Sequence, residues 1–233
     1  PDEEGPEEES RDLAEEIEEV DYVVGNPPFV RNERIPTDDR AVLDKLYASL
    51  QAGNTDLASY FLYAAFNYWM RPGGALGMVA PLSVANARMA RELRGRLNKF
   101  EITAVVSLEW LRLRKEIFKG VDIVPMLVFA RRAAAAASHQ IRVISGLERR
   151  HDLQQFVIDP AFAADHSSAI DFQKWYSLSP TGDWPVEITA TDVPILEKLK
   201  SADKLSSAGR PAYGIKLGST AHATSPYDES KIG

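Results

Sequence analysis

DYVVGNPPF, residues 21–29, joins a short apolar run to a turn that contains two prolines. The run Tyr22–Gly25 holds two adjacent valines and ends at a glycine, which is typical of a buried strand. Two successive prolines fix the backbone dihedral φ near about −65° and remove two N–H donors, so the carbonyls of this turn stay rigid. Open α/β sheets bind ligands at the carboxyl ends of their strands. The stretch therefore predicts a binding site at a sheet edge.

Strand-like and helix-like segments alternate after this turn. The sequence predicts helices near 38–50, from Asn54 or Thr55 to a turn at 71–74, from Ser83 to Asn98 and near 192–200, and strands at 75–80, 102–108, 123–130 and, as an edge strand, 141–144. This order is typical of a parallel α/β sheet with helices on both faces. The segment between 102–108 and 123–130 lacks a convincing crossover helix, so we expect these strands to form an antiparallel closing hairpin. Residues 160–190 are expected to be rich in loops.

Composition and charge exclude several classes of protein. The chain of 233 residues is 45% hydrophobic and 26% charged, without a run long and apolar enough to span a bilayer. The absence of cysteine excludes disulfides and cysteine-ligated zinc. No basic segment begins a signal peptide, so we expect a cytoplasmic protein. The four histidines are scattered and suggest no metal site.

The net charge of −7 is distributed unevenly along the chain. Residues 1–21 hold twelve acids and one base, so they form an acidic leader and the remainder is slightly basic. Slight basicity permits contact with nucleic acid without requiring it. Four arginines, at 88, 91, 94 and 96, are expected on the exposed face of one helix.

The NPPF turn offers hydrogen-bond acceptors beside a flat apolar ring. The Asn26 side chain and the rigid carbonyls of the turn can accept hydrogen bonds, and Phe29 supplies an aromatic face. An aromatic amine is a poor nucleophile, but two acceptors that hold its N–H groups can direct its lone pair toward an electrophilic methyl group. A base leaving a duplex could regain about 1–3 kcal/mol by stacking on Phe29.

The same residues resemble a known catalytic motif. DYVVGNPPF resembles the (D/N/S)-P-P-(Y/F) motif of amino-group DNA methyltransferases, and the resemblance extends over residues 20–131. Its further blocks are NTDL at 54–57 with YF at 60–61, RPGGALGMVAP at 71–81, and EIF at 116–118 ahead of IVPMLV at 123–128. The tail YGIKLG at 213–218 is similar to the entry into the target-recognition domain of large type II restriction–modification methyltransferases.

The resemblance implies a fold, a reaction and a set of residues. It implies the C-terminal part of a Rossmann-like, S-adenosyl-L-methionine-dependent methyltransferase sheet, followed by an irregular α+β extension. The substrate would be the N6 amine of a flipped adenine in double-stranded DNA. Asn26 and the Pro27 carbonyl would accept from that amine, Phe29 and Phe118 would contact the two faces of the base, and Pro28 and Phe61 would lie near the cofactor.

One feature of the family has no counterpart in the sequence. The glycine-rich cofactor loop precedes the catalytic motif in this subclass, whereas residues 1–25 are acidic and poor in glycine. We therefore expect a fragment, inactive alone, whose missing N-terminal half or partner chain carries the cofactor motif. The expected divisions are an acidic leader at 1–19, a partial catalytic domain at 20–150, an extension at 151–204 and the start of a recognition domain at 205–233.

Two other functions remain open. The same motif serves enzymes that methylate a protein glutamine amide or an RNA base amine, and those enzymes usually end soon after the last strand of the sheet. The insert at 30–53 and the long stretch beyond Arg132 favour a large DNA enzyme. A non-catalytic DNA-binding or assembly module that keeps the motif as a scaffold is the third hypothesis.

Overall fold

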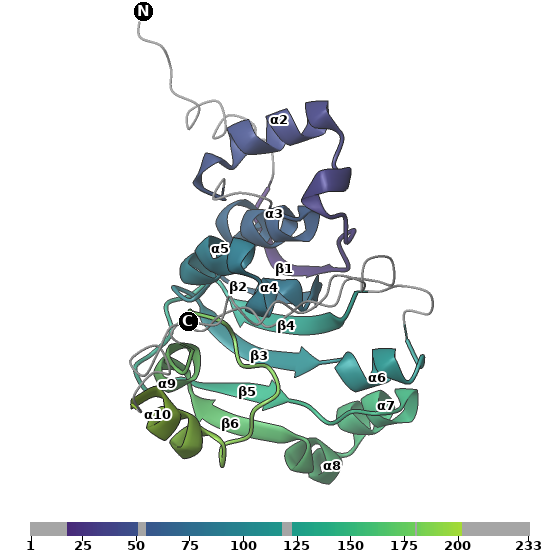
Figure 1. The fold of residues 1–233 in the computed structure, drawn as a ribbon, viewed down its shortest axis with the longest axis vertical. Helices are drawn as coiled ribbons and strands as arrows, with labels where there is room; N and C mark the ends of the chain where they lie inside the picture. The colour runs from purple at the N-terminus through teal and green to yellow at the C-terminus, as the bar shows by residue number, and fades with distance from the viewer. Residues whose placement is uncertain (1–17, 51–54, 118–122, 180, 202–233) are drawn as a thin grey trace, which may run out of the picture. The chain divides into compact units, whose positions relative to one another are not determined.

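A computed structural model describes residues 18–50, 55–117, 123–179 and 181–201 (Figure 1). The described residues between 18 and Lys200 form one compact unit. The acidic leader and the tail with YGIKLG lie almost entirely outside the described residues, and the four expected divisions of the chain stay predictions. Across the described ranges, no helix combines the length and hydropathy that a membrane span requires.

Six strands form a single mixed sheet in the order β1-β2-β4-β3-β5-β6. Their bounds are β1 Val20–Gly25, β2 Met70–Pro81, β3 Glu101–Ser107, β4 Pro125–Arg131, β5 Gln140–Ile144 and β6 Ser167–Asp171. β1 pairs with β2 and β3 with β5 in parallel, whereas β4 runs antiparallel to both β2 and β3. The expected α/β fold and the antiparallel closing hairpin are confirmed. The carboxyl ends of β1, β2 and β3 therefore share one edge.

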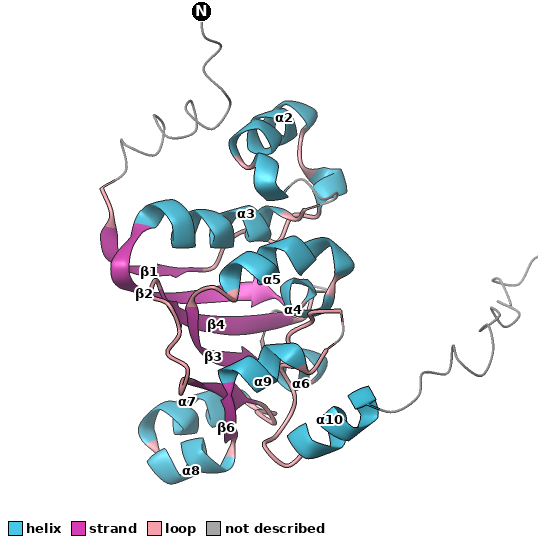
Figure 2. Cartoon of the chain, turned by 90° about the vertical axis from the view of Figure 1, so that its left-hand side faces the viewer, coloured by secondary structure: helices cyan, strands magenta, loops and turns pink. Residues whose placement is uncertain are grey.

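The helices lie mainly on one face of this sheet. Figure 2 shows α3, α4, α5 and α9 along that face, while α7 and α8 lie on the other side near β6. The helix bounds are α2 Thr37–Leu46, α3 Leu57–Ala64, α4 Ser83–Asn86, α5 Arg91–Leu97, α6 Glu109–Leu113, α7 Arg150–Ile158, α8 Pro160–Asp165, α9 Phe172–Ser177 and α10 Val193–Ser201. Four short helical segments complete the described chain: η1 Asn32–Arg34, η2 Ala48–Leu50, the π-helix η3 Ala65–Trp69 and η4 Arg88–Ala90.

Two apolar clusters hold these layers together. The larger lies between the sheet and the main helical face and includes the fully buried side chains of Phe66, Met126 and Trp175. The smaller lies around β3, α6 and α7, with Val106 and Leu111 at its centre. Burial of apolar surface is the main favourable term in folding, so these clusters fix how the helices pack on the sheet.

The opposite face of the sheet is exposed along β1 and β4. Side chains alternate along a strand, and β1 buries Val23 while Tyr22 is 75% and Val24 is 85% exposed. On β4, Phe129 lies opposite Gly77 of β2, and a Cβ added at Gly77 would come within 3.3 Å of the Phe129 ring. The described residues thus leave an apolar strip of the sheet facing solvent, where the sequence pattern predicted covering helices.

The turn expected at 71–74 is instead a bulge within β2. Met70 pairs with Val20 and Ala75 with Tyr22, so four residues of β2 lie opposite the single residue Asp21. Gly73 has a φ of +82°, and a Cβ on Gly74 would lie 2.9 Å from the Arg71 carbonyl oxygen. Both positions require glycine for these reasons. The preceding helix ends earlier than predicted, because η3 leads directly into Met70.

Other expected elements also differ from the structure. The helix predicted from Ser83 to Asn98 breaks at Ala87 into α4, η4 and α5, and its N-cap is Leu82. The N-cap of α3 is Asp56, because the Thr55 hydroxyl donates instead to the Leu50 carbonyl at 2.8 Å. Residues 160–190 hold α8, β6 and α9, so the strand predicted at 141–144 is an inner strand of the sheet.

Arg94 lies inside the protein, contrary to its predicted place on an exposed helix face. Its side chain is 1% exposed, and its Nη2 forms an ion pair of 2.7 Å with Asp183. Its Nε donates to the Gly182 carbonyl at 2.7 Å, and its Nη1 donates to the carbonyls of Val84 and Ala87 at 3.0 and 2.9 Å. Burial lowers the pKa of this guanidinium and Asp183 opposes that effect. A buried cation with this many acceptors joins α4, α5 and the segment after α9.

We predict that Arg94→Leu destabilises the protein by about 3–5 kcal/mol, because Asp183 and three carbonyl groups lose their donor. Urea denaturation monitored by circular dichroism measures the change. The control is Arg91→Leu, at an exposed position of the same helix. That variant should change the unfolding free energy by less than about 0.5 kcal/mol, and equal losses in the two variants would contradict the role of Arg94.

Candidate active site

A cavity of about 390 Å³ opens at the carboxyl edge of β1 and β2. Phe29, four residues beyond β1, forms part of its wall, as do Pro81 at the end of β2 and Asp56 just before α3. The remaining lining residues are Arg31, Glu33, Leu82, Ser83, Asn86, Ala87, Met89, Ile123 and Val124. The cavity therefore lies at the edge that the sequence predicted, with one member of the NPPF turn in its wall.

The chain after NPPF is held against the start of α3. The backbone N–H of Leu57 donates to the Val30 carbonyl at 3.0 Å, and the N–H of Asn32 donates to Asp56 Oδ1 at 3.1 Å. Arg40 of α2 donates to the carbonyls of Asn32 and Ile35. These bonds fix the segment that carries Phe29, Arg31 and Glu33 relative to α3.

A second link closes the far side of the cavity. The backbone N–H of Leu82 donates to the Val124 carbonyl at 2.7 Å, which joins the end of β2 to the start of β4. Pro81 lies directly opposite Pro125 in the β2–β4 pairing. Antiparallel pairing of β4 therefore brings Ile123 and Val124 into the cavity wall, although they lie far from NPPF in the sequence.

Asp56 is the ionisable group of the cavity whose pKa is clearly altered. Burial raises the pKa of this carboxyl and nearby Glu33 adds to the effect, while the Asn32 N–H and Arg31 act in the opposite direction. The wall thus presents carboxyl oxygens beside the apolar surfaces of Phe29, Pro81 and Val124. Such a wall suits a flat aromatic ligand that carries hydrogen-bond donors.

The predicted site residues differ in their positions. Phe29 is half-buried and lines the cavity, Asn26 and Pro28 are exposed, and Pro27 is buried. Phe61 is half-buried on α3 and meets Trp69 edge to face, with ring centroids 5.9 Å apart. Phe61 does not line this cavity, and Phe118 lies outside the described residues. The assigned roles of all these residues remain predictions.

Several residues of the cavity wall have no role that the sequence pattern predicts. Asp56 belongs to the NTDL block that supported the resemblance, but nothing in the sequence indicated a half-buried carboxyl in a cavity wall there. Asn86 and Met89 were expected within a continuous helix, and no proline or glycine marks the break at Ala87 that brings them to the cavity. Within the described ranges, no three histidine, aspartate or glutamate residues are grouped to hold a metal ion.

The strand order, the antiparallel β4 and the cavity at the carboxyl edge define a Rossmann-like α/β fold. Residues 3–110 match the model of the family described as Eco57I restriction-modification methylase. The resemblance to methyltransferases of restriction–modification systems is thereby confirmed for this part of the chain. No curated protein matches the sequence.

Solved structures show the same fold at low sequence identity. A modification subunit assigned to a type I restriction enzyme from Vibrio vulnificus YJ016 is 18% identical with a TM-score of 0.54, over 79% of this chain and 42% of that one. A type I methyltransferase subunit from Streptococcus thermophilus is 13% identical with a TM-score of 0.50, over 72% and 37%. DrdV, in a complex with DNA, is 16% identical with a TM-score of 0.52, over 76% and 19%. This chain thus matches less than half the length of each.

We predict that Asp56 makes the protein less stable as pH rises. Its pKa is raised in the folded state, so its protonated form favours folding and this contribution is lost as pH increases above its ordinary value of 3.8. Asp56→Asn should remove this pH dependence of the unfolding free energy, while the side-chain oxygen of the asparagine can still accept the hydrogen bond from the Asn32 N–H. Urea unfolding of both proteins, from below pH 3.8 to neutrality, measures the difference. If the free energy of unfolding of the wild type rose with pH relative to that of Asp56→Asn, the folded protein would stabilise the carboxylate, and the prediction would be contradicted.

Proposed function

We propose that this chain is the base-handling half of a methyltransferase that transfers a methyl group from S-adenosylmethionine to the N6 amine of adenine in DNA. The observation that carries the proposal is the position of Phe29, which extends from the NPPF turn into the wall of a cavity at the carboxyl edge of β1 and β2. The match of residues 3–110 to a restriction–modification methylase family supports a role in restriction–modification or phage defence. A DNA substrate implies the cytoplasm.

In the proposed mechanism the NPPF turn orients the amine. Asn26 Oδ1 and the Pro27 carbonyl accept the two N6 hydrogens, which favours a pyramidal nitrogen whose lone pair points away from them. Phe29 stacks on the flipped base and Phe118 contacts its other face. Bound S-adenosylmethionine supplies an electrophilic methyl group. The chain's own residues contribute by orientation and by fixed acceptors. The amine would lose one proton to solvent as the new N–C bond forms and the S–CH3 bond of the donor breaks, so the transfer needs no acid or base of strongly shifted pKa.

The described residues fit only part of a cofactor site. Pro28 and Phe61 are the residues proposed to lie near the cofactor, yet no strand of the described chain leads into a glycine-rich turn. We propose that another part of the same protein, or a partner chain, supplies that turn. The exposed side chains of Tyr22 and Val24 on terminal strand β1 support this proposal, because added strands and helices would bury them.

The first experiment tests the whole reaction. The parent protein with the cofactor-binding region is incubated with labelled S-adenosylmethionine and DNA, and we expect label on the N6 of adenine. Asn26→Ala should reduce the rate by about 10²–10³-fold, because one fixed acceptor is lost. Asn26 is exposed, so circular dichroism and melting should be unchanged. Gln140→Ala, which removes another exposed amide, is the control.

The alternatives predict other products. Label found only in RNA or in a protein glutamine would exclude the DNA enzyme and favour the second hypothesis. DNA binding without any label would favour the non-catalytic module. Full activity of Asn26→Ala on DNA would contradict the role given to the NPPF turn.

The isolated chain provides a separate prediction. We expect residues 1–233 alone to give no heat of binding when titrated with S-adenosylmethionine, because the residues that would hold most of the cofactor are supplied elsewhere. Isothermal titration calorimetry measures this directly. A dissociation constant in the micromolar range would show that the chain contains a complete cofactor site.

A further inference from the structure

The turn between α4 and α5 forms one wall of the cavity, and some of its side chains are also exposed to solvent. Residues 86–89, the wall turn, include three lining residues: Asn86, Ala87 and Met89. Ala87 has an extended backbone, with φ −76° and ψ 141°, which separates α4 from η4. A continuous helix would have directed these side chains differently, so this break determines what the cavity wall presents.

Buried contacts fix the wall turn from behind. Arg94 Nη1 donates to the carbonyls of Val84 and Ala87, which flank Asn86 along the chain. The backbone N–H of Trp184 donates to the Ala85 carbonyl at 2.8 Å, and the Trp184 indole donates to Asn98 Oδ1 at 2.9 Å. The conformation of the wall turn is therefore set by the protein's own core, before any ligand binds.

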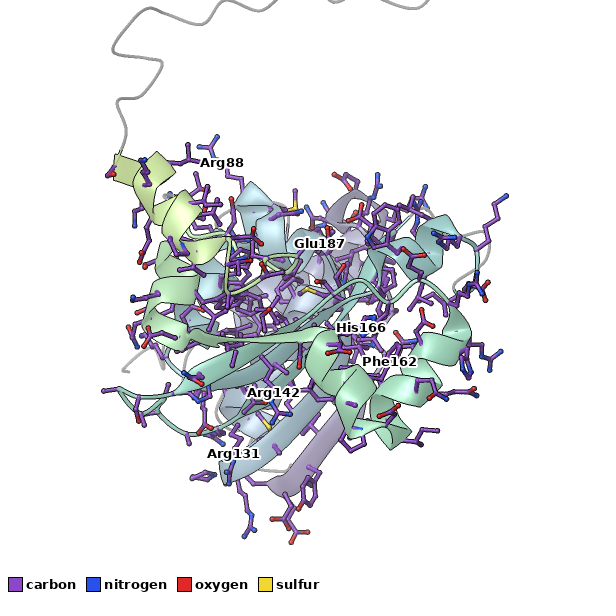
Figure 3. The ribbon with its side chains drawn as sticks, turned by 90° about the horizontal axis from the view of Figure 1, so that it is seen from below. Arg88, Arg131, Arg142, Phe162, His166 and Glu187 are labelled. Carbon is purple, nitrogen blue, oxygen red and sulfur yellow. The ribbon has the colours of Figure 1, made fainter. Side chains whose placement is uncertain are left out.

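The outward side of the wall turn combines a cation with an apolar side chain. Arg88 is exposed, and Figure 3 shows it pointing outward from the protein. No carboxylate of the described residues forms an ion pair with it. Met89 lines the cavity and is still 37% exposed, so it reaches the cavity mouth. Exposed Arg31 also lines the cavity, and its positive charge acts to lower the pKa of Asp56.

We propose that the wall turn is a DNA-contact element for the duplex that delivers the flipped base. Arg88 binds a backbone phosphate beside the target nucleotide, and Met89 packs against the base stack that is uncovered when the target leaves it. Methionine is among the apolar side chains that proteins insert at unstacked base steps, and its flexible thioether adapts to an irregular gap. This inference rests on the proposed function, because it assumes that a base enters the cavity from a duplex.

The two side chains have separable roles. A phosphate contact contributes to affinity through release of counterions, so its loss weakens binding and reduces the dependence on salt. An apolar contact with the opened stack contributes to flipping, because it offsets part of the unstacking cost, and it has little effect on salt dependence. Arg88 and Met89 therefore predict different changes in different measurements.

The test uses the parent protein and a duplex that contains the sequence found to be methylated, with 2-aminopurine in place of the target adenine. Arg88→Gln should weaken binding several-fold and lower the slope of log Kd against log salt by about one, with unchanged fluorescence at saturation. Met89→Ala should leave that slope unchanged and reduce the fluorescence rise at saturation by more than half. Arg150→Gln and Val157→Ala, at exposed positions of α7, are the matched controls.

Failure of this inference is distinguishable from failure of the proposed function. Wild-type behaviour of either Arg88→Gln or Met89→Ala, in a protein that still labels adenine in DNA, overturns the DNA-contact role of the wall turn alone. Absence of adenine labelling by the wild-type protein overturns the proposed function and this inference together. Melting curves of both variants that match the wild type show that any loss comes from the contact and not from unfolding.

Discussion

The parallel pairing of β1 with β2 brings the first two segments of the cavity wall to one edge of the sheet. Because the two strands run the same way, the NPPF turn and Pro81 emerge at one edge, and Phe29 and Leu82 line the same space. Antiparallel β4 then enters beside Pro81 from the opposite direction and adds Val124. Three segments distant in sequence thus meet through backbone pairing alone. The side chains at this edge can vary while the pairing holds them in position.

A buried ion pair between Arg94 and Asp183 connects the cavity wall to the segment that follows α9. Arg94 and Asp183 join α5 to residues that follow α9, and the same guanidinium holds the carbonyls around the break at Ala87. Such a pair contributes little net stability compared with apolar packing of the same volume, since both charges lose water. Its value here is directional, because four hydrogen bonds of one rigid cation specify the relative positions of three backbone segments.

Much of the fold could be predicted from local patterns. The apolar run before NPPF, the strand near 75–80 and the closing hairpin follow from periodicity and connection length, and each is present in the structure. The break at Ala87 and the burial of Arg94 could not be predicted, because their cause is the distant pair Asp183 and Trp184. Local propensity favours one continuous helix there, and tertiary contacts override it. The same contrast holds for the cavity wall. The place of Phe29 at the sheet edge follows from its local motif, whereas Asp56 and Met89 become wall residues only through packing of distant segments.

The exposed face of β1 also bears on the protein's assembly. β1 is a terminal strand of the sheet in the described chain, so its outer row of backbone N–H and C=O groups is open to pairing with another strand. With Tyr22 and Val24 exposed beside that edge, the chain presents a template for association with its own copies as well as with the segment that we propose completes the cofactor site. If that proposed segment pairs with β1, it would compete for the edge with the β1 strand of a second copy of the chain. The local concentration of that segment, highest when it belongs to the same polypeptide, would decide the outcome.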